Sequence, residues 1–196
     1  MLYEYIIFFA LAFIVSFSST PIAKKIAFSV GAVDVPNDAR RIHKKPVARL
    51  GGLAIFTGFL VSLLFGILST YLNMKGIVPS RQLFGMLIGA FIIVAVGIVD
   101  DIKQLGPRLK LVFQIMAALS VIFISDIRIV NITNPFAEGG TTQFNDFVSY
   151  PLTVLWIVGV TNAINLIDGL DGLAAGISSI SYLSLFFVSL ITGDTA

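Results

Sequence analysis

The stretch that decides the fold is QLFGMLIGAFIIVAVGIV, residues 82–99, which is followed directly by Asp100 and Asp101. It carries no charged residue, and about 20 apolar residues suffice for an α-helix to cross the hydrocarbon core of a bilayer. Its central run, residues 91–96, does not alternate between polar and apolar side chains as a strand of a membrane barrel would. The stretch therefore predicts a membrane-spanning helix.

Similar stretches recur along the chain, in which 57% of the 196 residues are apolar and 12% are charged. The fourth is short, but a helix that begins near Pro107 can direct the charged ends of Arg108 and Lys110 outward. We predict an all-α, polytopic membrane protein with about six transmembrane helices in a single membrane domain, 1–196. The expected spans are residues 5–23, 50–74, 82–99, 108–125, 147–167 and 172–193. Between the fourth and fifth spans, Asn134-Pro135 and Gly139-Gly140 indicate either a short outer β-hairpin or an ordinary loop.

Composition excludes several classes of function. The formal charge of +2 gives no argument for a nucleic-acid binder. The chain has no cysteine and one histidine, which excludes a disulfide framework and a zinc site of the usual kind. Any metal would be held by oxygen ligands.

Basic residues predict the orientation in the membrane. The first span has no basic region before it and no cleavage pattern after it, so we expect a retained helix. Three basic residues fall on one side of the membrane, Lys75, Arg81 and Arg128. The other ten fall on the opposite side: Lys24, Lys25, Arg40, Arg41, Lys44, Lys45, Arg49, Lys103, Arg108 and Lys110. The positive-inside rule then places these ten in the cytoplasm and both termini outside.

Polar residues gather at that same side. Asp100 and Asp101 end the third span, where acidic groups interact unfavourably with the helix macrodipole. Two such residues therefore favour a functional role over a helix end that is simply solvated. At the end of the fifth span, polar residues recur every three positions beside glycines. This pattern favours a binding site, where glycines let a ligand come close to the backbone, over an ordinary turn. These residues are Asn162, Asn165, Asp168 and Asp171. The basic loop before the second span is either an anion clamp or a loop that touches lipid headgroups.

Six carboxylates share this face with the ten basic residues and His43. The carboxylates are Asp34, Asp38, Asp100, Asp101, Asp168 and Asp171. Carboxylates repel phosphate unless a hard cation bridges them, and Mg²⁺ is typically held by one or two carboxylates together with substrate phosphates. The pattern favours phosphate transfer to a lipid acceptor at the membrane surface.

Three groups of residues carry a resemblance to a known family. They are DVPN (34–37) with Arg40, His43, Pro46 and RLGG (49–52); Asp100 and Asp101 with Lys110, Leu111 and Gln114; and NAINLIDGLDGLA (162–174). Over essentially its whole length the chain resembles the polyprenyl-phosphate N-acetylhexosamine-1-phosphate transferases. Its first loop is similar to that of the bacterial undecaprenyl-phosphate N-acetylglucosamine-1-phosphate transferases. One departure is Ala48, where a second proline is usual in the family.

The resemblance implies transfer of N-acetylglucosamine 1-phosphate from UDP-N-acetylglucosamine to undecaprenyl phosphate, with release of UMP. This would be the first membrane step of cell-wall or surface polysaccharide synthesis, such as that of teichoic acid or lipopolysaccharide. The implied cofactor is Mg²⁺, with Mn²⁺ as the alternative. The implied location is the bacterial cytoplasmic membrane with the active face toward the cytoplasm, and a homodimer is left open.

By the same resemblance, Asp100 and Asp101 form the catalytic pair, and Asn165 and Asp101 are the metal ligands. The implied substrate-binding residues are Lys44, Lys45, Arg49, Lys110, Asn162, Asp168 and Asp171. A phosphate monoester has a second pKa of about 6 and is mostly ionised already. Whether either aspartate acts as a base therefore stays open, and positioning or metal organisation is the alternative role.

Two later motifs of the family have no counterpart here: a Met-Gly-Asp-x-Gly-Ser stretch that supplies a principal Mg²⁺ ligand, and a histidine-rich cytoplasmic loop. We therefore expect an N-terminal portion of a transferase, whose activity alone is in doubt. Two alternatives remain. One is a non-enzymatic multi-pass membrane protein, either a small transporter or an assembly partner. The other is the related phospho-N-acetylmuramoyl-pentapeptide transferase, whose Gly-Thr-Pro-Thr-Met-Gly-Gly stretch is missing from the first loop.

Overall fold

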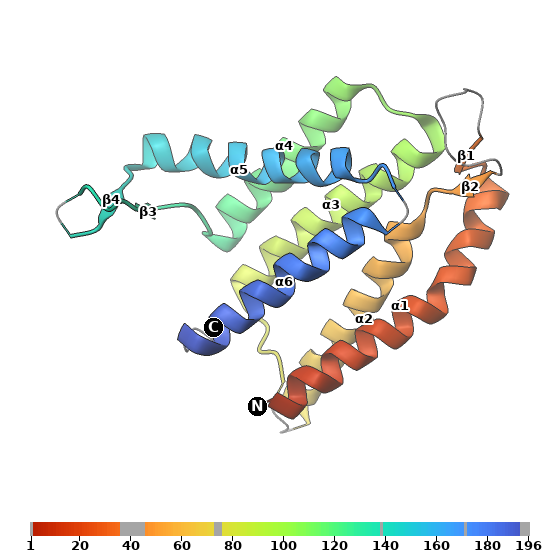
Figure 1. Cartoon of the computed structure of the whole chain (residues 1–196), viewed down its shortest axis with the longest axis horizontal. Coiled ribbons are helices and arrows are strands. Elements are labelled where there is room, and N and C mark those ends of the chain that lie inside the picture. The colour runs from red at the N-terminus through yellow and green to blue at the C-terminus, as the bar shows by residue number, and fades with distance from the viewer. Residues whose placement is uncertain (1, 36–45, 73–75, 138, 171, 193–196) are drawn as a thin grey trace. The chain divides into compact units, whose positions relative to one another are not determined.

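Long apolar helices make up most of the molecule. The computed structural model describes residues 2–35, 46–72, 76–137, 139–170 and 172–192 (Figure 1). Within these residues, six helices are long and apolar enough to cross a membrane. They are α1 (Leu2–Val30), α2 (Gly51–Tyr71), α3 (Arg81–Lys103), α4 (Pro107–Ser125), α5 (Asp146–Ile167) and α6 (Leu173–Thr192). The chain is a multi-pass, all-α membrane protein, as its uncharged segments predict.

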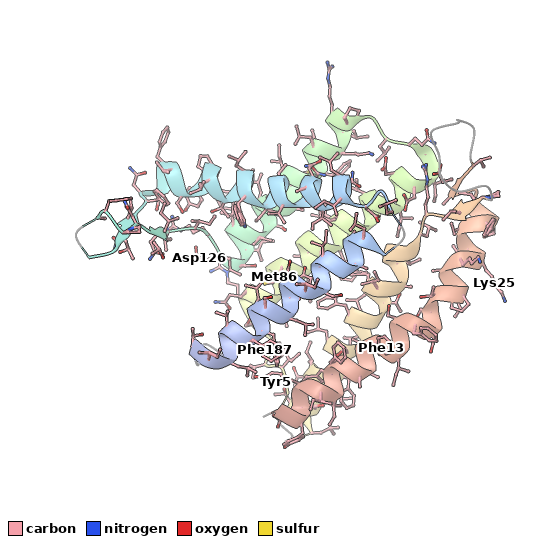
Figure 2. All side chains as sticks on the ribbon, in the orientation of Figure 1. Tyr5, Phe13, Lys25, Met86, Asp126 and Phe187 are labelled. Atoms are coloured by element: carbon pink, nitrogen blue, oxygen red, sulfur yellow. The ribbon has the colours of Figure 1, made fainter. Side chains whose placement is uncertain are left out.

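Apolar side chains cover the outside of the helices. Phe13 on α1 is 62% exposed and Phe187 on α6 is 58% exposed (Figure 2). Exposed apolar surface of this extent would be unfavourable in water and suits contact with lipid.

Two small antiparallel ladders accompany the helices. Strand β3 (Asn131–Thr133) pairs with β4 (Thr141–Gln143), so of the two alternatives for the segment between the fourth and fifth helices the structure has the hairpin. Strand β1 (Val33–Asp34) pairs with β2 (Val47–Ala48), with Val33 opposite Ala48. The β1–β2 pair joins the two ends of the first basic loop and was not predicted from the sequence.

The chain divides into two compact units, Met1–Arg128 and Ile129–Ala196, which are described separately. In the first unit α1 packs along α2 through small residues. A Cβ atom added to Gly58 would lie 2.5 Å from the Ala12 carbonyl oxygen and 2.8 Å from Cβ of Ser16. The Ser62 hydroxyl donates to the Phe8 carbonyl at 2.8 Å. Small residues that let helix backbones approach closely are the usual packing device between helices in lipid.

Helices α3 and α4 pack by the same device. A Cβ on Gly89 would lie 3.1 Å from the Ala117 carbonyl oxygen, and one on Gly85 would overlap Ser125. The Ser125 hydroxyl donates to the Gln82 carbonyl at 2.8 Å. Because α3 and α4 lie this close, the residues at the turn between them, 104–106, are held near both helices.

A small buried cluster ties the first loop to α3. Ala27, Ala32 and Leu50 form the cluster, and Ala48 and Ile98 pack against it. Ile98 lies two residues before Asp100 on α3. The β1–β2 ladder is therefore seated beside the helix end that carries the acidic pair.

In the second unit, the extended segment before β3 is fixed to α5. The Ser149 hydroxyl donates to the Ile129 carbonyl at 2.7 Å, and the Ile129 amide donates to the Thr153 hydroxyl at 2.9 Å. Ser149 and Thr153 are buried, at 0% and 3% exposure. Both backbone groups of Ile129 are thus satisfied by side chains one helical turn apart on α5.

Candidate functional site

The acidic end of α3 is built around Asp100. The helix ends at Lys103, and Gln104 adopts a left-handed conformation with φ of 51° while its amide donates to the Asp100 carbonyl at 2.7 Å. One carboxylate oxygen of Asp100 accepts from the Leu105 amide at 2.8 Å. The other lies 2.6 Å from Nζ of Lys110 on α4. Both carboxylate oxygens of Asp100 therefore have partners.

The Asp100–Lys110 pair is only partly shielded from its surroundings. The side chains are 25% and 34% exposed respectively. Pro107 stands at the first position of α4, where its missing amide costs no hydrogen bond, so the helix begins where the sequence predicts. This start places Lys110 in the first turn of α4. Its positive charge offsets the acidic groups that the C-terminal end of α3 would otherwise disfavour. Asp101 follows Asp100 on α3, about 100° further around the helix.

Arg49 forms a further ion pair in this unit. Its Nη2 donates to Oδ1 of Asp34 at 2.8 Å, with the two side chains 30% and 24% exposed. Arg49 was predicted to bind substrate, and the structure places it across the ends of the first loop. Lys44 and Lys45, predicted as further substrate contacts, lie outside the described residues.

The end of α5 supplies the predicted polar stripe in part. The helix ends at Ile167 with Asp168 as its C-cap residue, so Asn162 and Asn165 are helical and Asp168 is not. The side-chain amide of Asn162 donates to the Val158 carbonyl of its own helix at 2.8 Å. Asn165 and Asp168 are exposed, and Asp171 lies outside the described residues.

The structure thus brings together some of the predicted site residues. Asp100, Asp101 and Lys110 lie at one helix junction, and the Arg49–Asp34 pair lies at the ladder that packs beside α3. Asn162, Asn165 and Asp168 belong to the second unit and form a separate group.

The oxygen donors suit a hard cation. Among the described residues, no three His, Cys, Asp or Glu side chains gather at one place. Magnesium in phosphate-transfer sites needs only one or two carboxylates, because substrate phosphates and water complete its shell. Asp101 on α3 carries a carboxylate and Asn165 on α5 carries an amide oxygen, and the two residues belong to different units.

Two contacts of this region could not be found from the sequence. The first is the hydrogen bond from the Leu105 amide to the Asp100 carboxylate, which depends on the left-handed turn at Gln104. The second is Asp34 as the partner of Arg49, fifteen positions away. The only signal for the second was opposite charge at the two ends of one loop.

Comparison with known proteins identifies the family. The family model for glycosyl transferase family 4 matches residues 83–196. A probable undecaprenyl-phosphate N-acetylglucosaminyl 1-phosphate transferase of Bacillus subtilis is 42% identical, over 98% of this chain and 51% of the relative. A decaprenyl-phosphate N-acetylglucosaminephosphotransferase of Mycobacterium tuberculosis is 32% identical, over 91% of this chain and 44% of the relative.

A third relative, an undecaprenyl-phosphate alpha-N-acetylglucosaminyl 1-phosphate transferase of Salmonella typhi, is 29% identical, over 89% of this chain and 44% of the relative. The chain spans about half the length of the curated relatives it matches. No solved structure matches it. On the family match, which covers more than half of its residues, the chain belongs to glycosyl transferase family 4.

Proposed function

We propose that the protein transfers N-acetylglucosamine 1-phosphate from UDP-N-acetylglucosamine to undecaprenyl phosphate. An oxygen of the lipid phosphate forms a bond to the sugar-bearing phosphorus of the donor. The bond from that phosphorus to the oxygen bridging the two phosphates breaks, and UMP leaves with that oxygen. The product is a lipid diphosphate sugar.

The observation that carries the proposal is the Asp100–Lys110 ion pair beside Asp101, at the polar end of an apolar helix in a family 4 chain. Phosphoryl transfer depends chiefly on positioning and on neutralising charge on the phosphate oxygens. A lysine held at 2.6 Å by a carboxylate offers a fixed cation for a phosphate oxygen. The names of the relatives point to the same sugar and the same class of lipid acceptor.

The remaining residues take roles around the donor. Asp101 and Asn165 would hold Mg²⁺, or Mn²⁺ in its place, which when bound neutralises diphosphate charge. Asp100 keeps Lys110 in position, and Lys110 binds phosphate. The donor contacts proposed are Lys44, Lys45, Asn162, Asp168 and Asp171.

The proposed setting is the bacterial inner membrane, with the N-terminus outside and the acidic end of α3 toward the cytoplasm, where nucleotide sugars are made. The ten-to-three distribution of basic residues supports this orientation. The product would start teichoic acid, lipopolysaccharide or a similar surface polymer, and a homodimer is the proposed assembly to test. A transporter is less well supported, because the polar residues gather at helix ends rather than at mid-span.

The test is transfer of radiolabel from UDP-N-acetylglucosamine into lipid by membranes that contain the protein, expressed from its complete reading frame. Asp100→Asn and Asp101→Asn should each lower turnover by about 100-fold or more, because both remove a charge from the reacting centre. Asp126→Asn is the matched control: Asp126 caps the far end of α4 with φ of 56°, a conformation that asparagine also accepts. Undiminished turnover in both α3 variants, or no turnover in the unaltered protein, would contradict the proposal.

A further inference from the structure

The ends of the first basic loop are joined by a ladder too short to hold by itself. Strands β1 and β2 have two residues each, and the Arg49 amide adds one bond to the Ala32 carbonyl at 3.0 Å. Even longer isolated hairpins are only marginally stable in water. The contact between Asp34 and Arg49, together with the buried cluster of Ala27, Ala32 and Leu50, adds to holding the two strands side by side.

The geometry of this contact is that of a specific ion pair. Nη2 of Arg49 lies 2.8 Å from Oδ1 of Asp34, and less than a third of either side chain is exposed. Charge-assisted bonds between guanidinium and carboxylate are directional as well as strong. Asp34 belongs to β1 and Arg49 follows β2, so the pair bridges the two strands.

The ladder is also connected to the acidic end of α3. Ala48 of β2 and Ile98 of α3 pack against the same buried residues, Ala27, Ala32 and Leu50. Arg49 stands between Ala48 and Leu50 in the chain. A shift of Arg49 would therefore disturb the packing next to Ile98, which lies half a turn of helix before Asp100.

From these contacts we infer that Asp34 is a positioning residue, which holds Arg49 across the loop ends and so fixes the loop base against the end of α3. The inference rests on the proposed function for its effect on turnover. It assigns Arg49 a role through Asp34, in place of the substrate contact expected from sequence. The ion pair itself can be tested without any activity.

The test uses the absence of cysteine from the chain. Val33→Cys with Ala48→Cys places two thiols at directly opposed positions of the ladder, at a spacing that a disulfide can bridge. In this background, Asp34→Ala and Arg49→Ala should each slow oxidative cross-linking about two- to five-fold, the range expected for a partly exposed ion pair. The charge swap Asp34→Arg with Arg49→Asp should restore the rate. Lys25→Ala, which removes an exposed charge nearby on α1, is the control and should leave it unchanged (Figure 2).

Kinetics of the same substitutions without the added cysteines give the second measurement. Both single substitutions should lower kcat more than they raise KM for UDP-N-acetylglucosamine, and the swap should recover kcat. Cross-linking that is unchanged in both single variants would overturn the inference. It would also be overturned if the swap restored cross-linking while KM stayed high, since Arg49 would then contact the donor itself. If the unaltered protein shows no turnover, the proposed function fails, and the cross-linking rates still decide whether Asp34 holds Arg49.

Discussion

At the end of α3, both carboxylate oxygens of Asp100 are held, one by Lys110 at 2.6 Å and one by the Leu105 amide at 2.8 Å. At the end of α5, the side chains of Asn165 and Asp168 are exposed, and the helix stops between them. The first arrangement is fixed before any ligand arrives, whereas the second leaves polar groups accessible to one. Preorganised charge favours catalysis, and accessible amide and carboxylate groups favour binding. The two helix ends should therefore differ in which kinetic constant they control.

The largest effect on turnover is expected from removing the ion pair at the end of α3. Lys110→Met should lower kcat about 100-fold, because a cation positioned for phosphate is lost and Asp100 loses its partner. Asp100 and Lys110 act as a unit, so the double variant Asp100→Asn with Lys110→Met should be no worse than the more damaged single variant. Rates of lipid-linked product formation at saturating donor measure both statements. Fully additive losses would show that the two residues work separately.

A smaller effect on the kinetic constants is expected at the end of α5, where the polar side chains are exposed. Asn165→Ala and Asp168→Asn should each raise KM for UDP-N-acetylglucosamine about tenfold with less change in kcat. The first removes a proposed ligand of the metal ion that binds the donor diphosphate, and the second removes a charged hydrogen-bond acceptor for the donor. The proteins should unfold at the same temperature as the unaltered chain, since both side chains are exposed.

Thr161→Val is the control for this end of α5. Its hydroxyl donates to the Ile157 carbonyl of the same helix at 2.8 Å. Donor titrations and thermal unfolding in detergent provide the comparison. An unchanged KM together with a lowered unfolding temperature would mean that the end of α5 serves structure rather than binding.

The smallest effect on catalysis is expected at the opposite end of α5. Thr153→Val removes the acceptor of the Ile129 amide and should lower the free energy of unfolding by about 1–3 kcal/mol, the cost of an unpaired buried donor. The KM for the donor should stay unchanged. Unfolding in increasing denaturant measures the first expectation, with Thr161→Val as a control on the same helix. A raised KM would show that the two ends of α5 are coupled.

Much of the fold could be predicted because a bilayer makes charge costly. Each predicted span overlaps one helix, and α4 begins at Pro107. Helix ends were less predictable, since a helix can continue beyond the hydrocarbon core. The first helix runs past Lys24 and Lys25 to Val30, and α3 includes Asp100 and Asp101.

The site could be predicted by residue type more readily than by contact. Lys110 was predicted as a substrate-binding residue, and its ion pair with Asp100 depends on the short turn between α3 and α4. The Arg49–Asp34 pair was not anticipated, because loop closure over a long segment depends on packing by Ala32, Ala48 and Leu50, which carry no periodic signal. The two-residue strands β1 and β2 are below the length at which alternation can be recognised.

The backbone of Ile129 is hydrogen-bonded to two side-chain hydroxyls of α5, which has a consequence for the order in which the protein folds. Ser149 and Thr153 are synthesised after Ile129, and they stand one turn apart only once α5 is helical. Until then the backbone of Ile129 has to keep water as its partner. The segment that leads into the β3–β4 hairpin can therefore settle only after α5 has emerged and folded, which makes the order of translation part of the assembly of this unit.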